Sequence, residues 1–76
     1  MIRELENVIL DCNLPDYGLS AGDVGTVVLV HGRGKGYEVE FTTLAGETIA
    51  VVTLRTSQVK AVREHLIAHA RTLAAA

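Results

Sequence analysis

The sequence predicts a small all-β domain, a five-stranded SH3-like barrel built as a meander, followed by one C-terminal α-helix. Three observations favour this fold. Apolar residues alternate with a period of two in several stretches up to residue 54. Short glycine-containing turns separate the last three of these stretches. After Thr56 the apolar spacing changes to that of a helix. We therefore expect a single domain, with the barrel over residues 1–58 and the helix over residues 59–76.

Composition narrows the class of protein. A chain of 76 residues is long enough for one domain only. Nine acidic and seven basic residues give no overall field that would attract nucleic acid or an anionic membrane. The longest apolar run, Val27 to Val30, is far too short to span a bilayer, and the first residues do not form a signal peptide. We expect a cytoplasmic protein without membrane contact.

The expected strands cover residues 5–12, 23–31, 37–42 and 48–54. In the first strand, Val8, Leu10 and Cys12 lie on one face. The loop that follows contains Pro15, which favours a tight turn, and Gly18, which can adopt a positive φ. A long folded loop after the first strand is typical of SH3-like barrels.

Two hairpins should connect the last three of these strands. The second strand, DVGTVVLVH, is rich in β-branched residues and contains Gly25, where a small barrel would bend. The segment GRGKG leads to YEVEF, and a turn at Ala45-Gly46 leads to TIAVVTL. The predicted core consists of the apolar strand faces: Val24, Val28, Val39, Phe41, Val51 and Leu54.

The C-terminal helix is predicted over about residues 58–73, from the helical spacing of Val59, Val62, Leu66 and Leu73. It either covers one end of the barrel or forms an interface with a second copy or a partner protein. A short chain without disulfide or metal gains from such burial. We expect a homodimer or a hetero-complex, with the partner-binding face at Leu66, Ile67 and Ala70.

The chain also resembles a family of short bacterial proteins of unknown function, with the pattern "LP..GL..GDVGTVV", then "YEVEF", then "ET.AV.TL...Q.". The matching residues here are Leu14-Pro15, Gly18-Leu19, 22–28, 37–41, 47–54 and Gln58. The resemblance covers about residues 1–60 and implies an SH3-like barrel. By analogy with members that act as small accessory or toxin-neutralising partners, it also implies a role in protein binding.

A second resemblance suggests an alternative function. The segment GDVGTVVLVHGRGKG is similar to the KOW motif of ribosomal and transcription-elongation proteins, whose basic hairpin tip meets RNA phosphates. In this interpretation Arg33 and Lys35 would contact RNA. We favour the simpler interpretation, in which the glycines satisfy hairpin geometry and the two cations keep an exposed tip soluble.

Catalytic and metal chemistry has weaker candidates. His65 and His69 would share a helix face and could chelate a metal, but the segment lacks a third ligand and the Glu of a zincin. Cys12 alternates with core residues, which favours a packing role over a nucleophilic one. We therefore expect no metal site and no other cofactor.

Acidic residues are the last candidates. Glu38, Glu40 and Glu47 form an acidic face on which paired carboxylates could act as acid and base. Exposed carboxylates titrate almost normally, so a guard against unwanted strand pairing is the favoured role. The sequence thus predicts no enzyme, but a non-catalytic binding module that acts through a protein partner.

Overall fold

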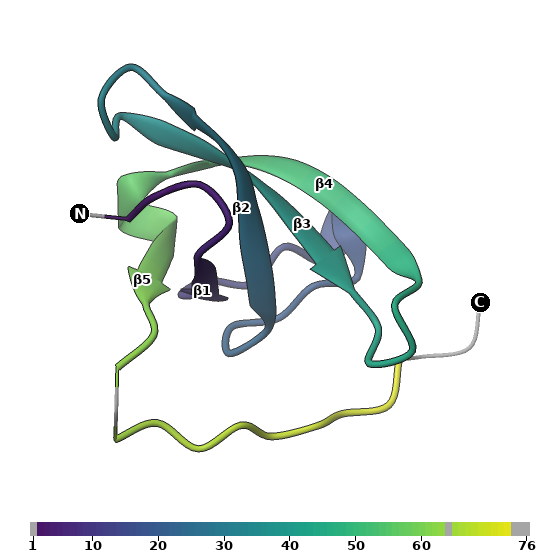
Figure 1. Ribbon diagram of the computed structural model, residues 1–76. Helices are drawn as coiled ribbons and strands as arrows, with labels where there is room; N and C mark the ends of the chain where they lie inside the picture. The colour runs from purple at the N-terminus through teal and green to yellow at the C-terminus, as the bar shows by residue number, and fades with distance from the viewer. Residues whose placement is uncertain (1, 64, 74–76) are drawn as a thin grey trace.

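The computed structural model describes residues 2–63 and 65–73 and contains one antiparallel sheet of five strands (Figure 1). The strands are β1 (Asn7–Leu10), β2 (Val24–His31), β3 (Gly36–Thr42), β4 (Thr48–Arg55) and β5 (Val59–Ala61). Two short 3₁₀ turns, η1 (Pro15–Tyr17) and η2 (Thr56–Gln58), lie in the connections before β2 and before β5. The order across the sheet is β4-β3-β2-β1-β5.

The predicted meander is confirmed as β2, β3 and β4. The first hairpin turns through Gly32, Arg33 and Gly34, all with positive φ. The second turns at Gly46, which has a φ of 89° and whose N–H donates to the Thr43 carbonyl at 2.9 Å. All four predicted strands are present. β1 is shorter than expected because pairing with β2 involves only Asn7, Val8 and Ile9.

The loop after β1 also folds as the sequence indicates. Pro15 opens η1, and Gly18 ends it in the left-handed region with a φ of 69°. Leu14 and Leu19 form an isolated bridge with each other; Leu19 lies in the core and Leu14 packs against it. The loop is therefore pinned to the sheet at both ends of η1.

The prediction of a C-terminal helix is wrong. Residues 59–61 form β5, whose pairing with β1 matches Val59 with Leu10 and Ala61 with Val8, and Val59 is buried in the core. The described residues beyond β5 form no helix. A lone helix of about 12–15 residues is marginal in water without packing. The free edge of β1, by contrast, offers backbone hydrogen bonds to residues 59–61.

Among the described residues, no helix has the length and apolar character needed to cross a membrane.

The sheet is curved but not closed (Figure 1). β4 and β5 lie at its opposite edges, and no pairing joins them in the part of the chain that the structure describes. The expected closure into a barrel is therefore not found. The chain passes from one edge to the other through η2 and brings β5 beside β1.

Half of the predicted core residues are buried, which confirms those predictions. Val39, Phe41 and Leu54 are buried, and the remaining core side chains are Val8, Ile9, Leu10, Leu19, Val27, Tyr37, Val52 and Val59.

The other three predicted core residues are exposed, which corrects the choice of strand face. Val24, Val28 and Val51 are 48%, 41% and 53% exposed, while Val27 and Val52 are 0% and 6% exposed. Both strands are apolar on both faces, so alternation does not indicate which face is buried. A register shift between Val27 and Leu29 also places Val28 outside the regular pairing.

Candidate functional site

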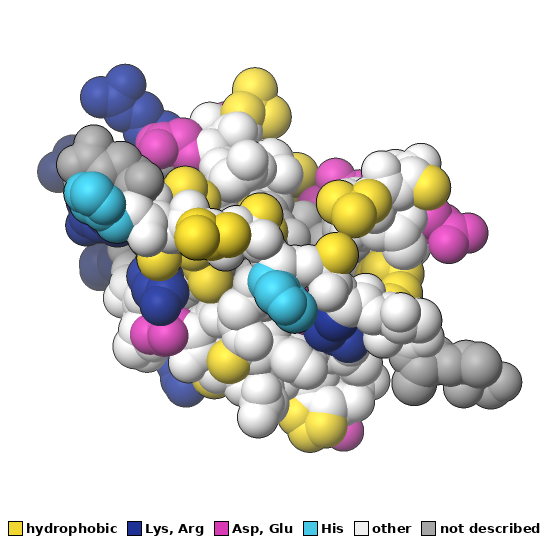
Figure 2. All heavy atoms as spheres, turned by 90° about the horizontal axis from the view of Figure 1, so that it is seen from below, with side chains coloured by type: hydrophobic (Ala, Val, Ile, Leu, Met, Phe, Trp, Pro, Cys, Tyr) yellow, Lys and Arg dark blue, Asp and Glu magenta, His cyan; other side chains and the backbone are white. Residues whose placement is uncertain are grey.

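The described residues that follow β5, 62–63 and 65–73, are named the C-terminal segment. A groove lies between the sheet and residues 68–73 of this segment. The segment runs as an extended chain along the lower side of the sheet in Figure 1, and Figure 2 views the molecule from that side. The groove has a volume of about 660 Å³ and an apolar floor. Its floor is lined by Leu19, Val24, Phe41 and Ile49, and its other wall by residues 68–73. We name it the C-terminal groove.

One ionic contact fastens the segment across this groove. The guanidinium of Arg71 donates from Nε to Asp23 Oδ1 at 2.8 Å and from Nη2 to Asp23 Oδ2 at 2.7 Å. Nη2 also donates to the Gly18 carbonyl at 2.9 Å. Such a two-pronged arginine–carboxylate pair is among the strongest charged hydrogen-bond geometries. We name the Asp23 carboxylate and the Gly18 carbonyl the arginine acceptor.

The acceptor is held in place by the sheet and the loop before β2. The Asp23 Oδ2 accepts the Ser20 N–H at 2.8 Å, and the Asp23 carbonyl accepts the Leu10 N–H at 2.8 Å. The hydrogen bonds from Arg71 lower the pKa of the Asp23 carboxyl most strongly. Burial raises it to a smaller extent and the Ser20 N–H lowers it again, so the pKa lies below its ordinary value. The carboxylate is therefore a fixed negative charge at the rim of an apolar groove.

The rest of the C-terminal segment is loosely attached. All of its described residues are exposed. Its one backbone–backbone hydrogen bond among the described residues joins the Leu66 N–H to the Arg63 carbonyl at 3.2 Å. The segment therefore has neither a buried apolar face nor a hydrogen-bonded ladder, and Arg71 is its main attachment.

The structure brings the predicted partner-binding residues into this segment, although not on a helix. Ile67 is 94% exposed and Leu66 is 44% exposed. Ala70 lies in the wall of the groove, next to Arg71. Sequence reasoning missed the pairing of Asp23 with Arg71, because the two residues are 48 positions apart and no local pattern connects them.

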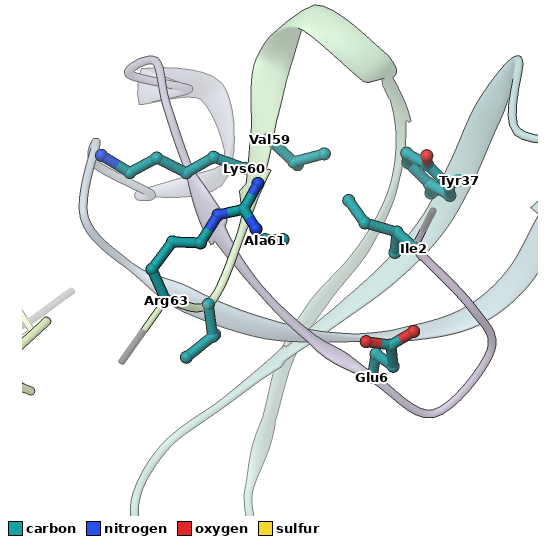
Figure 3. Close-up of a pocket in the computed structure, with 8 residues that line it drawn as sticks. Ile2, Glu6, Tyr37, Val59, Lys60, Ala61 and Arg63 are labelled. Atoms are coloured by element: carbon teal, nitrogen blue, oxygen red, sulfur yellow. The ribbon is translucent and has the colours of Figure 1, made fainter. Parts of the chain in front are cut away.

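A second pocket, of about 500 Å³, lies beside β5 at the other side of the molecule. Figure 3 shows Ile2, Val59 and Tyr37 on its apolar side, with Glu6 and Arg63 approaching from opposite walls. Lys60 points away from the centre of the pocket, and its Nζ lies 3.9 Å from Asp11 Oδ1. The polar groups of this pocket do not converge on one point, so it offers no defined ligand geometry.

The basic hairpin tip stands apart from both hollows. Arg33 and Lys35 are exposed between β2 and β3, and Arg33 adopts a φ of 60° in the turn. The tip projects beyond the sheet in Figure 1. Its neighbour His31 lies against an acid, with Nε2 2.6 Å from Glu38 Oε2, so a carboxylate lies at the base of the basic hairpin.

The acidic face is organised by hydrogen bonds. Glu38 accepts the Thr53 hydroxyl at 2.7 Å, and Glu40 accepts the Thr48 hydroxyl at 2.7 Å. The hydrogen bond with His31, followed by that with Thr53, lowers the pKa of Glu38. Both acids lie on β3, which is flanked by β2 and β4. The predicted role as guards of a free sheet edge is therefore wrong for these two residues.

The metal and thiol candidates are not assembled into a site. His65 and His69 lie on the extended segment instead of on one helix face. The described residues contain no group of three or more His, Cys, Asp or Glu placed to hold a metal ion. Cys12 is half-buried and packs against the core, with its Sγ 3.9 Å from the Gln58 side-chain amide.

Comparison with known proteins identifies the family. Residues 4–61, most of the chain, match the family described as a domain of unknown function (DUF4926), and the chain belongs to this family. The match ends at β5 and does not include the C-terminal segment. No curated protein and no solved structure matches the chain.

Proposed function

We propose that this member of the DUF4926 family is a non-catalytic binding module that acts through a protein partner. The observation that carries the proposal is the C-terminal segment, which displays Leu66 and Ile67 to solvent beside an apolar groove. Apolar side chains grouped on a small surface are typical of protein interaction sites. We further propose that the partner is of the accessory or toxin-neutralising kind.

The chemistry of the groove supports binding over catalysis. Its lining is mainly apolar, with Thr42 and Thr43 among its polar members, and its carboxylate Asp23 has a lowered pKa because it is bonded to Arg71. A general acid or base needs a pKa near the working pH. The pKa of Asp23 is shifted away from that range, so the carboxylate suits an ion pair with a guanidinium and not proton transfer.

The fold and the cellular setting extend this proposal. A long loop after β1, a three-stranded meander and a final strand that returns beside β1 support assignment as an SH3-like barrel opened between β4 and β5. With one cysteine in the whole chain, a cytoplasmic setting follows the usual distribution of disulfides between compartments.

The test is a quantitative pull-down from the host with three proteins: the wild-type chain, the double variant Leu66→Ser/Ile67→Ser, and the control Val51→Thr. Val51 is also exposed, but it lies on β4. A true partner is retained by wild type and control and is depleted by the double variant. It must then bind as a purified protein, with an affinity that falls less steeply with salt than phosphate contacts would give, because most of the interface is apolar. Partners retained equally by all three proteins would contradict the proposal.

The RNA-contacting alternative predicts a different result. Binding through Arg33 and Lys35 would be lost in an Arg33→Ala/Lys35→Ala variant and would weaken steeply between about 50 and 200 mM salt. It would not depend on Leu66 or Ile67, which belong to a different surface. Salt-dependent binding of an RNA oligonucleotide, lost in this variant and unchanged in Leu66→Ser/Ile67→Ser, would replace the protein-binding proposal.

A further inference from the structure

We propose that the arginine acceptor and the C-terminal groove form a recognition site for an extended, arginine-containing segment of the partner protein. The C-terminal segment occupies this site as an internal mimic. This inference rests on the proposed function and adds the chemistry of the segment that is recognised.

The acceptor selects arginine by geometry. Two oxygens of one carboxylate and one backbone carbonyl face two nitrogens of the same planar group, at 2.7 to 2.9 Å. A guanidinium presents donors in a rigid planar fork, which can meet all three acceptors at once. The ammonium of lysine is a compact point charge and does not reproduce this parallel pairing.

The acceptor does not depend on the segment for its shape. Asp23 directly precedes β2 and is bonded through its side chain to the Ser20 N–H and through its carbonyl to Leu10 of β1. Gly18 lies at the end of η1 with its conformation fixed by the loop. Both residues lie within the family match at residues 4–61, whereas Arg71 lies outside it. The site thus belongs to the family domain, and its occupant belongs to the extension.

The seated segment indicates which sequence fits. Small residues, Ala68 and Ala70, line the groove before Arg71, and Leu73 lines it two positions afterwards. No backbone hydrogen bond joins the described part of the segment to the sheet, so recognition depends on side chains. We expect a preference for a small residue, then arginine, then an apolar residue two positions later.

The same contacts make the internal occupant replaceable. The segment is exposed throughout its described length, and even the side chain of Arg71 is 37% exposed. A tethered occupant competes through its effective concentration, which reaches the millimolar range for a short flexible linker. An external segment with more contacts can therefore displace it, and removing the internal arginine should open the site.

The experiment titrates a fluorescent peptide with the sequence of residues 66–73 into full-length proteins and follows its anisotropy. We expect the peptide to bind Arg71→Ala at least about tenfold more tightly than wild type, because the internal competitor is weakened. The matched control Arg63→Ala removes an arginine that lies beside the other pocket, and it should behave as wild type. A second peptide carries lysine in place of arginine (Arg71→Lys). The Arg71→Ala protein should bind this lysine peptide at least about tenfold more weakly than it binds the arginine peptide.

Dependence on the acceptor is tested with Asp23→Asn in the Arg71→Ala background, with an amide NMR spectrum to verify that the sheet remains folded. Loss of peptide binding in this folded protein supports the site. If the double variant is unfolded, the inference is decided by the comparison of arginine and lysine peptides on the Arg71→Ala protein. Equal binding of the two peptides, or no gain of Arg71→Ala over wild type, overturns the inference. A concentration-dependent dimer that Arg71→Ala abolishes would also overturn it, since the segment would then exchange between two copies.

These outcomes separate the inference from the proposed function. If a partner depends on Leu66 and Ile67 but the peptide titrations fail, the arginine site is refuted and the proposed binding module is still supported. Arginine-specific peptide binding without any partner that depends on Leu66 and Ile67 supports the site and contradicts the proposed interface.

Discussion

The sheet and the C-terminal segment are both rich in apolar residues, yet they are held in different ways. In the sheet, side chains such as Val8, Val27 and Val39 are completely buried, and each strand is hydrogen-bonded to at least one neighbour. In the segment, no described residue is buried, and one guanidinium supplies the main contacts.

This difference shows that apolar composition alone does not place a segment in the core. Burial of apolar area is the main stabilising contribution, but the backbone also needs hydrogen-bond partners. Residues 59–61 obtain both at the free edge of β1. Beyond Ala61 the described residues are all exposed and form no backbone hydrogen bond to the sheet, and the segment follows the lower side of the sheet to the arginine acceptor. Stability therefore resides in the sheet, and the segment is where we propose that a partner binds.

The largest expected effect tests the sheet. Phe41 is 2% exposed and lies between the core and the floor of the C-terminal groove. Phe41→Ala should lower the free energy of unfolding by about 3–5 kcal/mol, since it removes a large buried side chain. Thermal and urea unfolding measure this change. Val51→Ala, on the exposed face of β4, should cost far less, and equal losses for the two variants would show that the buried face is wrongly assigned.

A smaller loss is expected at Gly25 in β2. A Cβ at this position would lie 2.5 Å from Val39 Cγ1 and 2.9 Å from Phe41 Cε1, closer than carbon atoms can pack. Gly25→Ala should therefore cost about 1–3 kcal/mol through displacement of the core. Urea unfolding provides the measurement, with Val28→Ala in the exposed bulge of the same strand as control. An unchanged midpoint for Gly25→Ala would contradict the close packing of β2 on β3.

The features that the sequence predicted well are those fixed by local chemistry. Gly18 and Gly46 adopt the positive φ expected of turn glycines, and the strands that alternate polar with apolar residues, such as Gly36–Thr42, bury the expected face. Where both faces are apolar, as around Val27 and Val52, alternation carries no information on the buried face. The shift between Val27 and Leu29 also has no local sequence signal.

The features that were missed depend on contacts distant in sequence. Helical spacing after Thr56 is real, but a helix there would need a surface to pack on, and Val59 is taken by the sheet edge. The predicted partner-binding residues Leu66, Ile67 and Ala70 lie in an extended segment and not on a helix; their role in binding stays a prediction. The arginine acceptor could not be found in advance, because Asp23 and Arg71 meet only after the loop and the segment are both placed.

The third prediction concerns the attachment of the segment. Arg71→Ala should leave the sheet folded, with a smaller shift in melting temperature than Gly25→Ala, because no buried contact of the sheet is lost. Limited proteolysis should cut residues 62–73 several-fold faster than in wild type, since local opening governs cleavage. Arg63→Ala should be cut at the wild-type rate. Unchanged proteolysis of Arg71→Ala would mean that contacts other than the guanidinium hold the segment.

The smallest effect is a pH dependence of this attachment. Because Arg71 lowers the pKa of Asp23 in the folded chain, the carboxylate binds its proton less readily when the segment is docked than when it is free. Docking is therefore at full strength above the ordinary aspartate pKa of about 3.9 and is lost as pH falls through the lowered value. The side chain of Arg71 is 37% exposed, so solvent screening weakens the effect.

NMR signals of the Arg71 side chain should report this release below about pH 4, while the amide signals of β2 and β3 still show a folded sheet. In Asp23→Asn the segment should be detached at every pH and the transition absent. A segment that stays docked in Asp23→Asn, or a release with pH that this variant leaves unchanged, would show that a group other than the Asp23 carboxylate controls docking. The main attachment would then have to be reassigned.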